Sequence, residues 1–392
     1  MRWSWRMLGV GAAAALLAVA LACSGCKKPP SATGGGAAPI DREWNVWRAT
    51  RAQTGVASTA APDAMRLLWR FKTGGPITSS AVVGGGRVYI GSGDNRVYAI
   101  DLEKGTKVWS YKTGDEVEAP PILLDGVVYI GSDDGNLYAL DAARGALKWK
   151  FETQDMIIGA ATWMAPSRGG RWILVGSYDH CLYGIDADTG AEVWKVETNN
   201  YINGSPAVSG GLVVFGGCDG MLHLIDAEAG AEKAAIGLGA YIAASPAVSG
   251  GVAYAGDMGE REGWFAAVDL KTGKPLWQYR GDGAFCSSPA VGEKLVVVGC
   301  RDYLVHAIDR FSGQKAWTFE TGGEVDSSPV ISGDRVIVGS SDGWLYMLSL
   351  ADGRKVWSYE IGGSLTSSPA VAGDVVVIGG SDGAVYAFGP KR

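Results

Sequence analysis

The sequence has 392 residues, of which 47% are hydrophobic and 59 are glycine, and its formal net charge at pH 7 is −6. The apolar content is sufficient for a large core without metals or disulfides, and the glycine content is typical of many short strands joined by tight turns. No basic stripe occurs along the chain, which excludes binding to nucleic acid as its main function.

The first 22 residues have the features of an export signal. Arg2 and Arg6 form a positive region, and an apolar run of 15 residues follows from Leu8, which is short for a membrane span. The run ends directly before Cys23 and resembles a bacterial lipobox. We predict residues 1–22 as a signal peptide and Cys23 as the lipidated residue, with ordinary signal-peptidase cleavage at the same place as the alternative. By resemblance to enteric lipoproteins, the lack of Asp at the following position, which is Ser24, implies transit to the outer membrane.

A segment of two parts separates the leader from the repeats. Residues 24–40 are rich in small residues and proline, so we expect a flexible tether. Residues 41–66 carry Trp44 and Trp47, and we expect them to form a plug or strap packed on the folded part. We therefore predict an N-terminal region at 23–66 and one folded domain at 67–392.

From about residue 67 onward, one cassette returns in steps of 40 to 45 residues. A period of this length, built from short strands and Gly-rich turns, predicts a β-propeller. Ala234 occupies the slot that holds a tryptophan elsewhere. The repeated tryptophans are Trp69, Trp109, Trp149, Trp194, Trp277, Trp317 and Trp357.

Eight three-strand units follow one another, and the strand around Trp69 precedes the first of them. The eighth unit has no Trp strand of its own. We therefore expect an all-β, eight-bladed propeller of four-stranded antiparallel blades, in which the N-terminal strand completes the last blade. Such closure removes exposed sheet edges.

The turn before each repeated tryptophan contains an Asp and a Gly. In its fullest form, as at Asp186-Ala-Asp-Thr-Gly190, it resembles the tryptophan-docking motif of the quinoprotein (PQQ) propeller superfamily. The Asp can accept turn N–H groups, the Gly takes a left-handed conformation, and the indole covers the neighbouring blade. Ala234 and Ser349 depart from the motif, so we expect weaker contacts there. The predicted structural carboxylates are Asp101, Asp141, Asp186, Asp226, Asp269 and Asp309.

The superfamily that the motif resembles includes calcium- and PQQ-dependent dehydrogenases. The residues that these enzymes use at their active sites cannot be matched to positions in this sequence. Those enzymes share a pair of adjacent cysteines. The cysteines of the repeat region here are not adjacent to one another: they are Cys181, Cys218, Cys286 and Cys300. The cassettes vary by only five residues, which leaves no insertion to enclose a cofactor. We expect no catalytic residue, no PQQ and no calcium, and keep a PQQ-dependent dehydrogenase as the least favoured alternative.

Cys286 and Cys300 flank one hairpin. A turn at Glu293-Lys294 would place Cys300 opposite Ser287 and disfavour a disulfide, while a three-residue turn would permit one.

One position in each unit, just before the innermost strand, is expected to face the central channel. Glu118, Asn203 and Asp326 are the candidate channel or rim residues among them. Carboxylates suit calcium, but we interpret these charges as a solvated rim and predict no metal site. The three histidines lie on three different units, which disfavours zinc.

An exported, lipidated and non-catalytic ring of this kind resembles the BamB family, the propeller lipoproteins of outer-membrane β-barrel assembly. The resemblance implies a monomeric scaffold on the periplasmic side of the outer membrane, which binds protein partners of the assembly machinery and is anchored by its lipid. A ligand- or glycan-binding envelope module, at the cell surface or soluble in the periplasm, is the alternative. The longer turns at Trp163–Arg171 and Met258–Trp264 are the expected contact surface.

Overall fold

The computed structural model describes residues 42–259 and 261–390. The predicted signal peptide, the lipidation site Cys23 and the tether at 24–40 lie outside these residues. Within the described ranges, no helix has the length and apolarity needed to cross a membrane.

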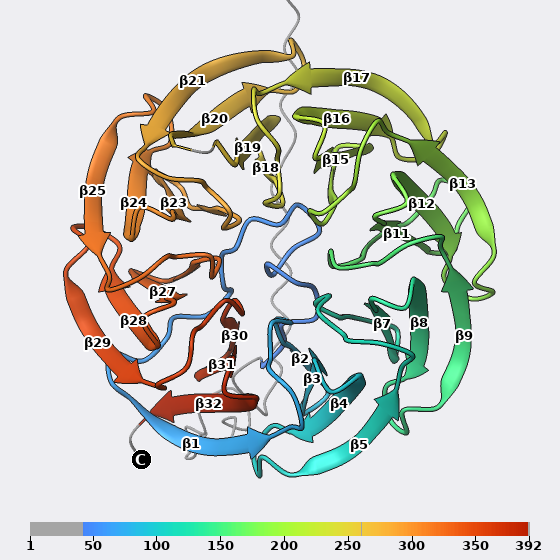
Figure 1. Cartoon of the computed structure of the whole chain (residues 1–392), viewed down its shortest axis with the longest axis horizontal. Coiled ribbons are helices and arrows are strands. Elements are labelled where there is room, and N and C mark those ends of the chain that lie inside the picture. Colours follow the sequence, from blue (N-terminus) through green and yellow to red (C-terminus); the bar gives the residue numbers. More distant parts are fainter. Residues whose placement is uncertain (1–41, 260, 391–392) are drawn as a thin grey trace, which may run out of the picture. The chain divides into compact units, whose positions relative to one another are not determined.

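In the described residues, thirty-two strands form eight antiparallel sheets of four strands, arranged as the blades of a ring (Figure 1). This confirms the predicted all-β, eight-bladed propeller. Blades 1 to 4 consist of β2 (Val82–Gly84), β3 (Arg87–Ser92), β4 (Arg96–Asp101) and β5 (Lys107–Lys112); β6 (Ile122–Leu124), β7 (Val127–Gly131), β8 (Asn136–Asp141) and β9 (Leu147–Glu152); β10 (Thr162–Met164), β11 (Trp172–Gly176), β12 (Cys181–Asp186) and β13 (Glu192–Glu197); β14 (Ala207–Ser209), β15 (Leu212–Gly216), β16 (Met221–Asp226) and β17 (Ala231–Gly237).

Blades 5 to 8 repeat the arrangement, and the last one takes its outermost strand from the start of the ring. Their strands are β18 (Ala247–Ser249), β19 (Val252–Gly256), β20 (Gly263–Asp269) and β21 (Lys274–Gly281); β22 (Ala290–Val291), β23 (Leu295–Gly299), β24 (Leu304–Asp309) and β25 (Lys315–Glu320); β26 (Val330–Ser332), β27 (Arg335–Gly339), β28 (Trp344–Ser349) and β29 (Lys355–Glu360); β30 (Ala370–Ala372), β31 (Val375–Gly380), β32 (Ala384–Pro390) and β1 (Met65–Lys72).

The burial of each strand follows its place in the blade. The second strands are apolar and covered on both faces, as in β7, where every residue is buried. The outermost strands alternate between half-buried and exposed residues, as in β9, because only one face meets the next blade. The hairpin between β2 and β3 turns at Gly85-Gly86, whose φ angles of 57° and 72° are those a type I′ turn requires.

The ring closes through the pairing of β1 with β32, as predicted (Figure 1). Trp69 lies opposite Ala387 and Phe71 opposite Val385, with a register shift between Leu67 and Trp69. Because β1 pairs with β32, the outer side of β32 is not left as an unpaired edge.

Neighbouring blades contact one another through the repeated tryptophans. In blade 1, Trp109 Nε1 donates to the carbonyl of Ala142 in blade 2 at 3.0 Å. A Cβ atom at Gly145 would lie 2.6 Å from the Trp109 ring, so the indole rests directly on this glycine. The turn is capped by Asp141, whose Oδ1 accepts the N–H groups of Ala143 and Arg144.

The same geometry recurs around most of the ring. The Nε1 atoms of Trp69, Trp149, Trp277 and Trp317 donate to a carbonyl of the next blade, at 2.7–3.0 Å. Trp194 rests on Gly230, and Trp357 packs on Phe388 in blade 8. The capping carboxylates that accept turn N–H groups in this way also include Asp101, Asp186, Asp226, Asp269 and Asp309.

The two departures from the motif differ in their effect. Where Ala234 replaces tryptophan, a Cβ at Gly273 would meet only Ile236, at 3.7 Å, so the contact between blades 4 and 5 is looser. Where Ser349 replaces the carboxylate, Trp317 still rests on Gly353 and its Nε1 bonds the Leu350 carbonyl. The expected weakening therefore occurs at Ala234, while the indole contact near Ser349 is retained.

The hairpin of blade 6 turns at Glu293-Lys294, closed by the Gly292 N–H donating to the Leu295 carbonyl at 2.9 Å. Cys286 and Cys300 are not bridged, and the Cys300 thiol donates to the carbonyl of Gly283.

Candidate functional site

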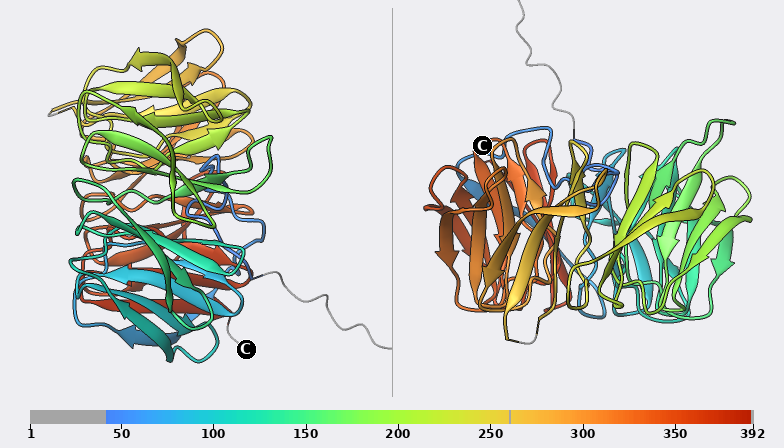
Figure 2. Two further views of the ribbon diagram at one scale, coloured as in Figure 1. Left: turned by 90° about the vertical axis from the view of Figure 1, so that its right-hand side faces the viewer. Right: turned by 90° about the horizontal axis from the view of Figure 1, so that it is seen from above.

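The two faces of the ring differ because residues 42–64, here named the strap, cover one of them (Figure 2). Backbone hydrogen bonds join the strap to the innermost strands of most blades in turn. We name the covered side the strap face and the other side the open face. The bonded pairs are Trp44 with Val83, Asn45 with Leu123, Arg51 with Val208, Ala52 with Val248, Thr54 with Val291 and Gly55 with Ile331.

Arg48 fixes the middle of the strap to the inside of the ring. Its side chain is fully buried and donates to the carbonyls of Pro329 at 2.6 Å and Pro289 at 2.7 Å. Gln53 adds a bond to the carbonyl of Pro206 at 2.8 Å. Burial lowers the pKa of Arg48 to about 9, because no carboxylate compensates its charge among the described residues.

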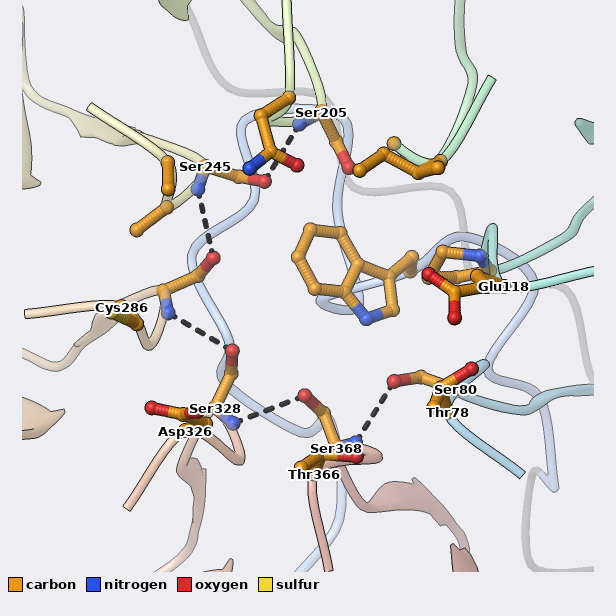
Figure 3. A pocket seen from close by; sticks show the side chains of 18 of the residues that line it. Thr78, Ser80, Glu118, Ser205, Ser245, Cys286, Asp326, Ser328, Thr366 and Ser368 are labelled. Atoms are coloured by element: carbon orange, nitrogen blue, oxygen red, sulfur yellow. Dashed lines mark hydrogen bonds between the residues drawn. The ribbon is translucent and has the colours of Figure 1, made fainter. Parts of the chain in front are cut away.

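A cavity of about 420 Å³, here named the channel mouth, lies at the open-face end of the channel. Trp47 of the strap contributes to its lining, so the strap forms its floor. The walls come from the segment before the innermost strand of every blade (Figure 3). The three predicted channel residues, Glu118, Asn203 and Asp326, all lie in this lining.

Six serine hydroxyls encircle the channel mouth and link the blades (Figure 3). Each Oγ accepts a backbone N–H from the preceding blade, as when Ser245 Oγ accepts from Ser205 N at 2.7 Å. Pro120 and Ala160 replace serine in blades 2 and 3, where the series is interrupted. The serines are Ser80, Ser205, Ser245, Ser288, Ser328 and Ser368.

The charged groups of the channel mouth are unequally paired. Asp326 receives two hydrogen bonds from the guanidinium of Arg301, both at 2.9 Å. Glu118 accepts no hydrogen bond from the described residues, and burial together with the charge of Glu116 raises its pKa. The channel mouth therefore contains one compensated carboxylate and one uncompensated carboxylate.

Glu116, Glu118 and Asp133 form the acidic part of the open face, with one oxygen of each within 4.8 Å of the others. Burial, followed by repulsion from the surrounding carboxylates, raises the pKa of Asp133 to about 7. Oxygen ligands of this kind suit a hard cation, and Asp133 Oδ1 is buried without a hydrogen-bond partner among the described residues, but the arrangement equally fits a crowded acidic rim.

A second group of possible metal ligands, Cys300, Asp302 and His306, has a structural explanation. His306 Nε2 lies 3.0 Å from Asp302, and its Nδ1 lies 2.9 Å from the Tyr279 hydroxyl. Five other blades have a tyrosine at the position of His306. The hydroxyl of that tyrosine donates to the aspartate four residues before it. The histidine thus replaces that tyrosine and keeps the same aspartate contact.

Large side chains gather on the open face of blades 3 to 5. We name Tyr178, Tyr201, Tyr241, Met258 and Trp264 the aromatic sector; sequence reasoning included Met258 and Trp264 in an expected contact surface but missed the three tyrosines. Tyr178 and Tyr201 are stacked with ring centroids 4.8 Å apart, and Tyr241 is 58% exposed. The only sequence signal is a tyrosine two residues before the channel position in two successive cassettes.

The two long turns expected to form a contact surface lie on opposite faces. Met258–Trp264 belongs to the open face, where Met258 lines the channel mouth. Trp163–Arg171 begins in β10 and belongs to the strap face. Its Trp163 is not an exposed anchor, because the guanidinium groups of Arg51 and Arg171 lie over its ring at 4.4 Å and 5.1 Å. The two turns therefore do not form one continuous surface.

Comparisons with known proteins agree with the repeat architecture. A family model described as "Outer membrane protein assembly factor BamB" matches residues 53–159, 153–233 and 219–392. No curated protein matches the chain.

Among solved structures, BamB from Moraxella catarrhalis is 22% identical, with a TM-score of 0.70, and the match covers 83% of this chain and 100% of that one. A computationally designed protein, Ika8, is 18% identical with a TM-score of 0.72, covering 83% and 100%. A europium-containing methanol dehydrogenase is 14% identical with a TM-score of 0.74, covering 89% and 98%. At these identities the likeness shows the fold alone, which scaffolds and enzymes share.

Proposed function

Because the chain belongs to the family described as outer membrane protein assembly factor BamB, we propose that it is a non-catalytic scaffold in the assembly of outer-membrane β-barrel proteins. In this proposal the mature chain is a lipoprotein anchored through Cys23 to the periplasmic side of the outer membrane. The tether at 24–40 then gives the propeller freedom to meet its partners while the lipid keeps it at the membrane.

The aromatic sector is the observation that supports partner binding most directly. Tyr201, Tyr241 and Trp264 are 43%, 58% and 40% exposed, although large aromatic side chains are usually covered. Tyrosine and tryptophan are enriched among the residues that dominate binding energies at protein interfaces. The neighbouring acidic group around Glu116 and Asp133 favours a partner segment that combines apolar side chains with basic ones.

The lining of the channel mouth supports a non-catalytic role over PQQ-dependent oxidation. PQQ is a polycarboxylate and needs cationic partners in its site. The described lining offers the carboxylates Glu118 and Asp326 and a single guanidinium, Arg301, which is already bound to Asp326. These residues do not fit PQQ, because its carboxylates would face uncompensated negative charge.

Co-purification from membranes tests the scaffold proposal. Full-length tagged protein is expected to retain a barrel-insertion subunit, and the double variant Tyr201→Ser/Tyr241→Ser is expected to lose most of it. Phe311→Ser is the matched control, since Phe311 is 74% exposed on a turn that follows Asp309, on the strap face. Equal recovery of the subunit with all three proteins would count against the aromatic sector, and no recovery with the unmodified protein would count against the scaffold role.

Fractionation tests the anchor separately. Cys23→Ala is expected to move the protein from the membrane fraction to the soluble fraction without changing its thermal unfolding. A protein that remains membrane-bound after this substitution would show that Cys23 is not the anchor.

A further inference from the structure

The channel mouth has the shape of a small-molecule site. Its volume of about 420 Å³ lies within the range of ligand pockets, and the strap closes it at one end. Trp47 in its lining is 8% exposed, and the indole Nε1 has no hydrogen-bond partner among the described residues. A buried donor without a partner is costly, so a ligand oxygen that reaches it would gain a favourable contact.

The serine ring supplies further hydrogen-bonding groups. Each of the six Oγ atoms already accepts a backbone N–H, while none of the hydroxyls donates to an acceptor among the described residues. Their protons are therefore available to the cavity. Asn203 also lines it, and its amide can both donate and accept. A lining in which donors predominate but acceptors are also present matches a ligand with several hydroxyl groups.

The charge of the channel mouth favours a ligand with a cationic group over an anionic one. Arg301 neutralises Asp326, whereas Glu118 has no positive partner among the described residues. Glu116 and Asp133, whose oxygens lie within 4.8 Å of the Glu118 carboxylate, add to the negative potential at that side. A single cationic group on the ligand would relieve this repulsion, whereas an anionic ligand would increase it.

We propose that the channel mouth binds a hydroxyl-rich ligand with one ammonium group, in chemical class an amino sugar. The ammonium group lies beside Glu118, and the hydroxyls bond the serine ring and the Trp47 N–H. The residues that carry this proposal, Glu118, Trp47 and the serine ring, lie outside the aromatic sector, so the proposal does not depend on the scaffold role.

Calorimetric titration of the full-length protein tests the site with three probes: glucosamine, glucose and ethanolamine. Glucosamine is expected to bind at least about tenfold more tightly than either of the others, because only it offers both the charge and the hydroxyls. Equal affinity for ethanolamine and glucosamine would show binding by charge alone and would overturn the hydroxyl part of the proposal. No measurable binding of glucosamine would overturn the whole.

Two variants assign the contacts. Glu118→Gln keeps the size of the side chain, and it is expected to reduce glucosamine affinity to the level of glucose and leave glucose binding unchanged. Trp47→Phe keeps an aromatic ring but removes the N–H, and it is expected to weaken both sugars by a similar factor. The control is Glu360→Gln, an exposed position outside the channel-mouth lining, which should bind as the unmodified protein does. Glucosamine binding that survives Glu118→Gln unchanged would contradict the proposed site, and thermal unfolding of each variant verifies that it is folded.

Discussion

The guanidinium of Arg48 donates a hydrogen bond to the backbone carbonyl of Pro329 at 2.6 Å, which links the strap to blade 7 through the interior of the ring. A second bond at 2.7 Å reaches Pro289 in the segment that leads into blade 6. One buried side chain thus joins the strap to two neighbouring blades.

Arg48→Met should therefore destabilise the protein by roughly 3 kcal/mol, because two buried carbonyls lose their charged donor. Urea unfolding measures the change. Arg51→Ala is the control, since the Arg51 side chain is exposed and lies over Trp163, and its loss should cost at most about 1 kcal/mol. Similar costs for the two substitutions would mean that the Arg48 bonds contribute little.

Gly145→Ala and Gly273→Ala form a matched pair. Both glycines have positive φ, 71° and 68°, so alanine is strained equally at both. A Cβ at Gly145 would lie 2.6 Å from Trp109, whereas at Gly273 the nearest atom is 3.7 Å away, in Ile236. Gly273→Ala should cost about 1 kcal/mol and Gly145→Ala about 2 kcal/mol more. Equal losses in denaturant unfolding would show that the indole contact adds nothing beyond the backbone strain.

Asp133 should produce a pH-dependent difference in stability. Its pKa is raised to about 7 in the folded protein, so between about pH 4 and about pH 7 the folded state binds more protons than the unfolded state. Its contribution to stability therefore falls as pH rises through this window. Asp133→Asn should raise the melting temperature above about pH 7 relative to the unmodified protein, with the gain shrinking towards about pH 4.

The control for Asp133→Asn is Asp188→Asn, at an exposed turn position of blade 3, which should show no such trend. A gain for Asp133→Asn that is constant across the pH range would contradict the assigned cause.

His223 occupies in blade 4 the position that tyrosine occupies in five other blades. Its Nε2 lies 3.0 Å from Asp219, and both side chains are almost completely buried. His223→Tyr should preserve stability within about 1 kcal/mol, because the hydroxyl can replace Nε2 as donor to Asp219, while His223→Phe should cost roughly 2 kcal/mol. Thermal unfolding of the two variants gives the comparison, and a phenylalanine variant as stable as the tyrosine variant would exclude a role for the contact.

The architecture was predictable because every cassette repeats the same signal. The spacing of Trp109, Trp149 and their equivalents predicts the blades, and the lone strand at Trp69 predicts the closure. The same register placed Glu118, Asn203 and Asp326 at one position per unit, and the ring brings that position from every blade to the channel.

Features that do not repeat were only partly predictable: a plug or strap was expected from Trp44 and Trp47, but its contacts were not. The strap is held mainly by backbone hydrogen bonds and by Arg48. The proline carbonyls that Arg48 contacts lie far along the chain, so no periodic pattern in the sequence indicates this contact. Tyr201 and Tyr241 stand in turns, where no hydrophobic alternation identifies their environment. The length of the turns at Trp163–Arg171 and Met258–Trp264 indicated insertions. It did not show that the first turn joins the first and second strands of its blade while the other joins the second and third strands, which places the two turns on opposite faces.

The pairing of β1 with β32 also has a consequence for biogenesis. The first strand of the ring to be synthesised finds its partner only when the last has been made, so neither edge is satisfied during elongation. An extended, unpaired edge invites association with other chains. Protection of this edge by a chaperone, until the final hairpin is complete, would therefore reduce such association.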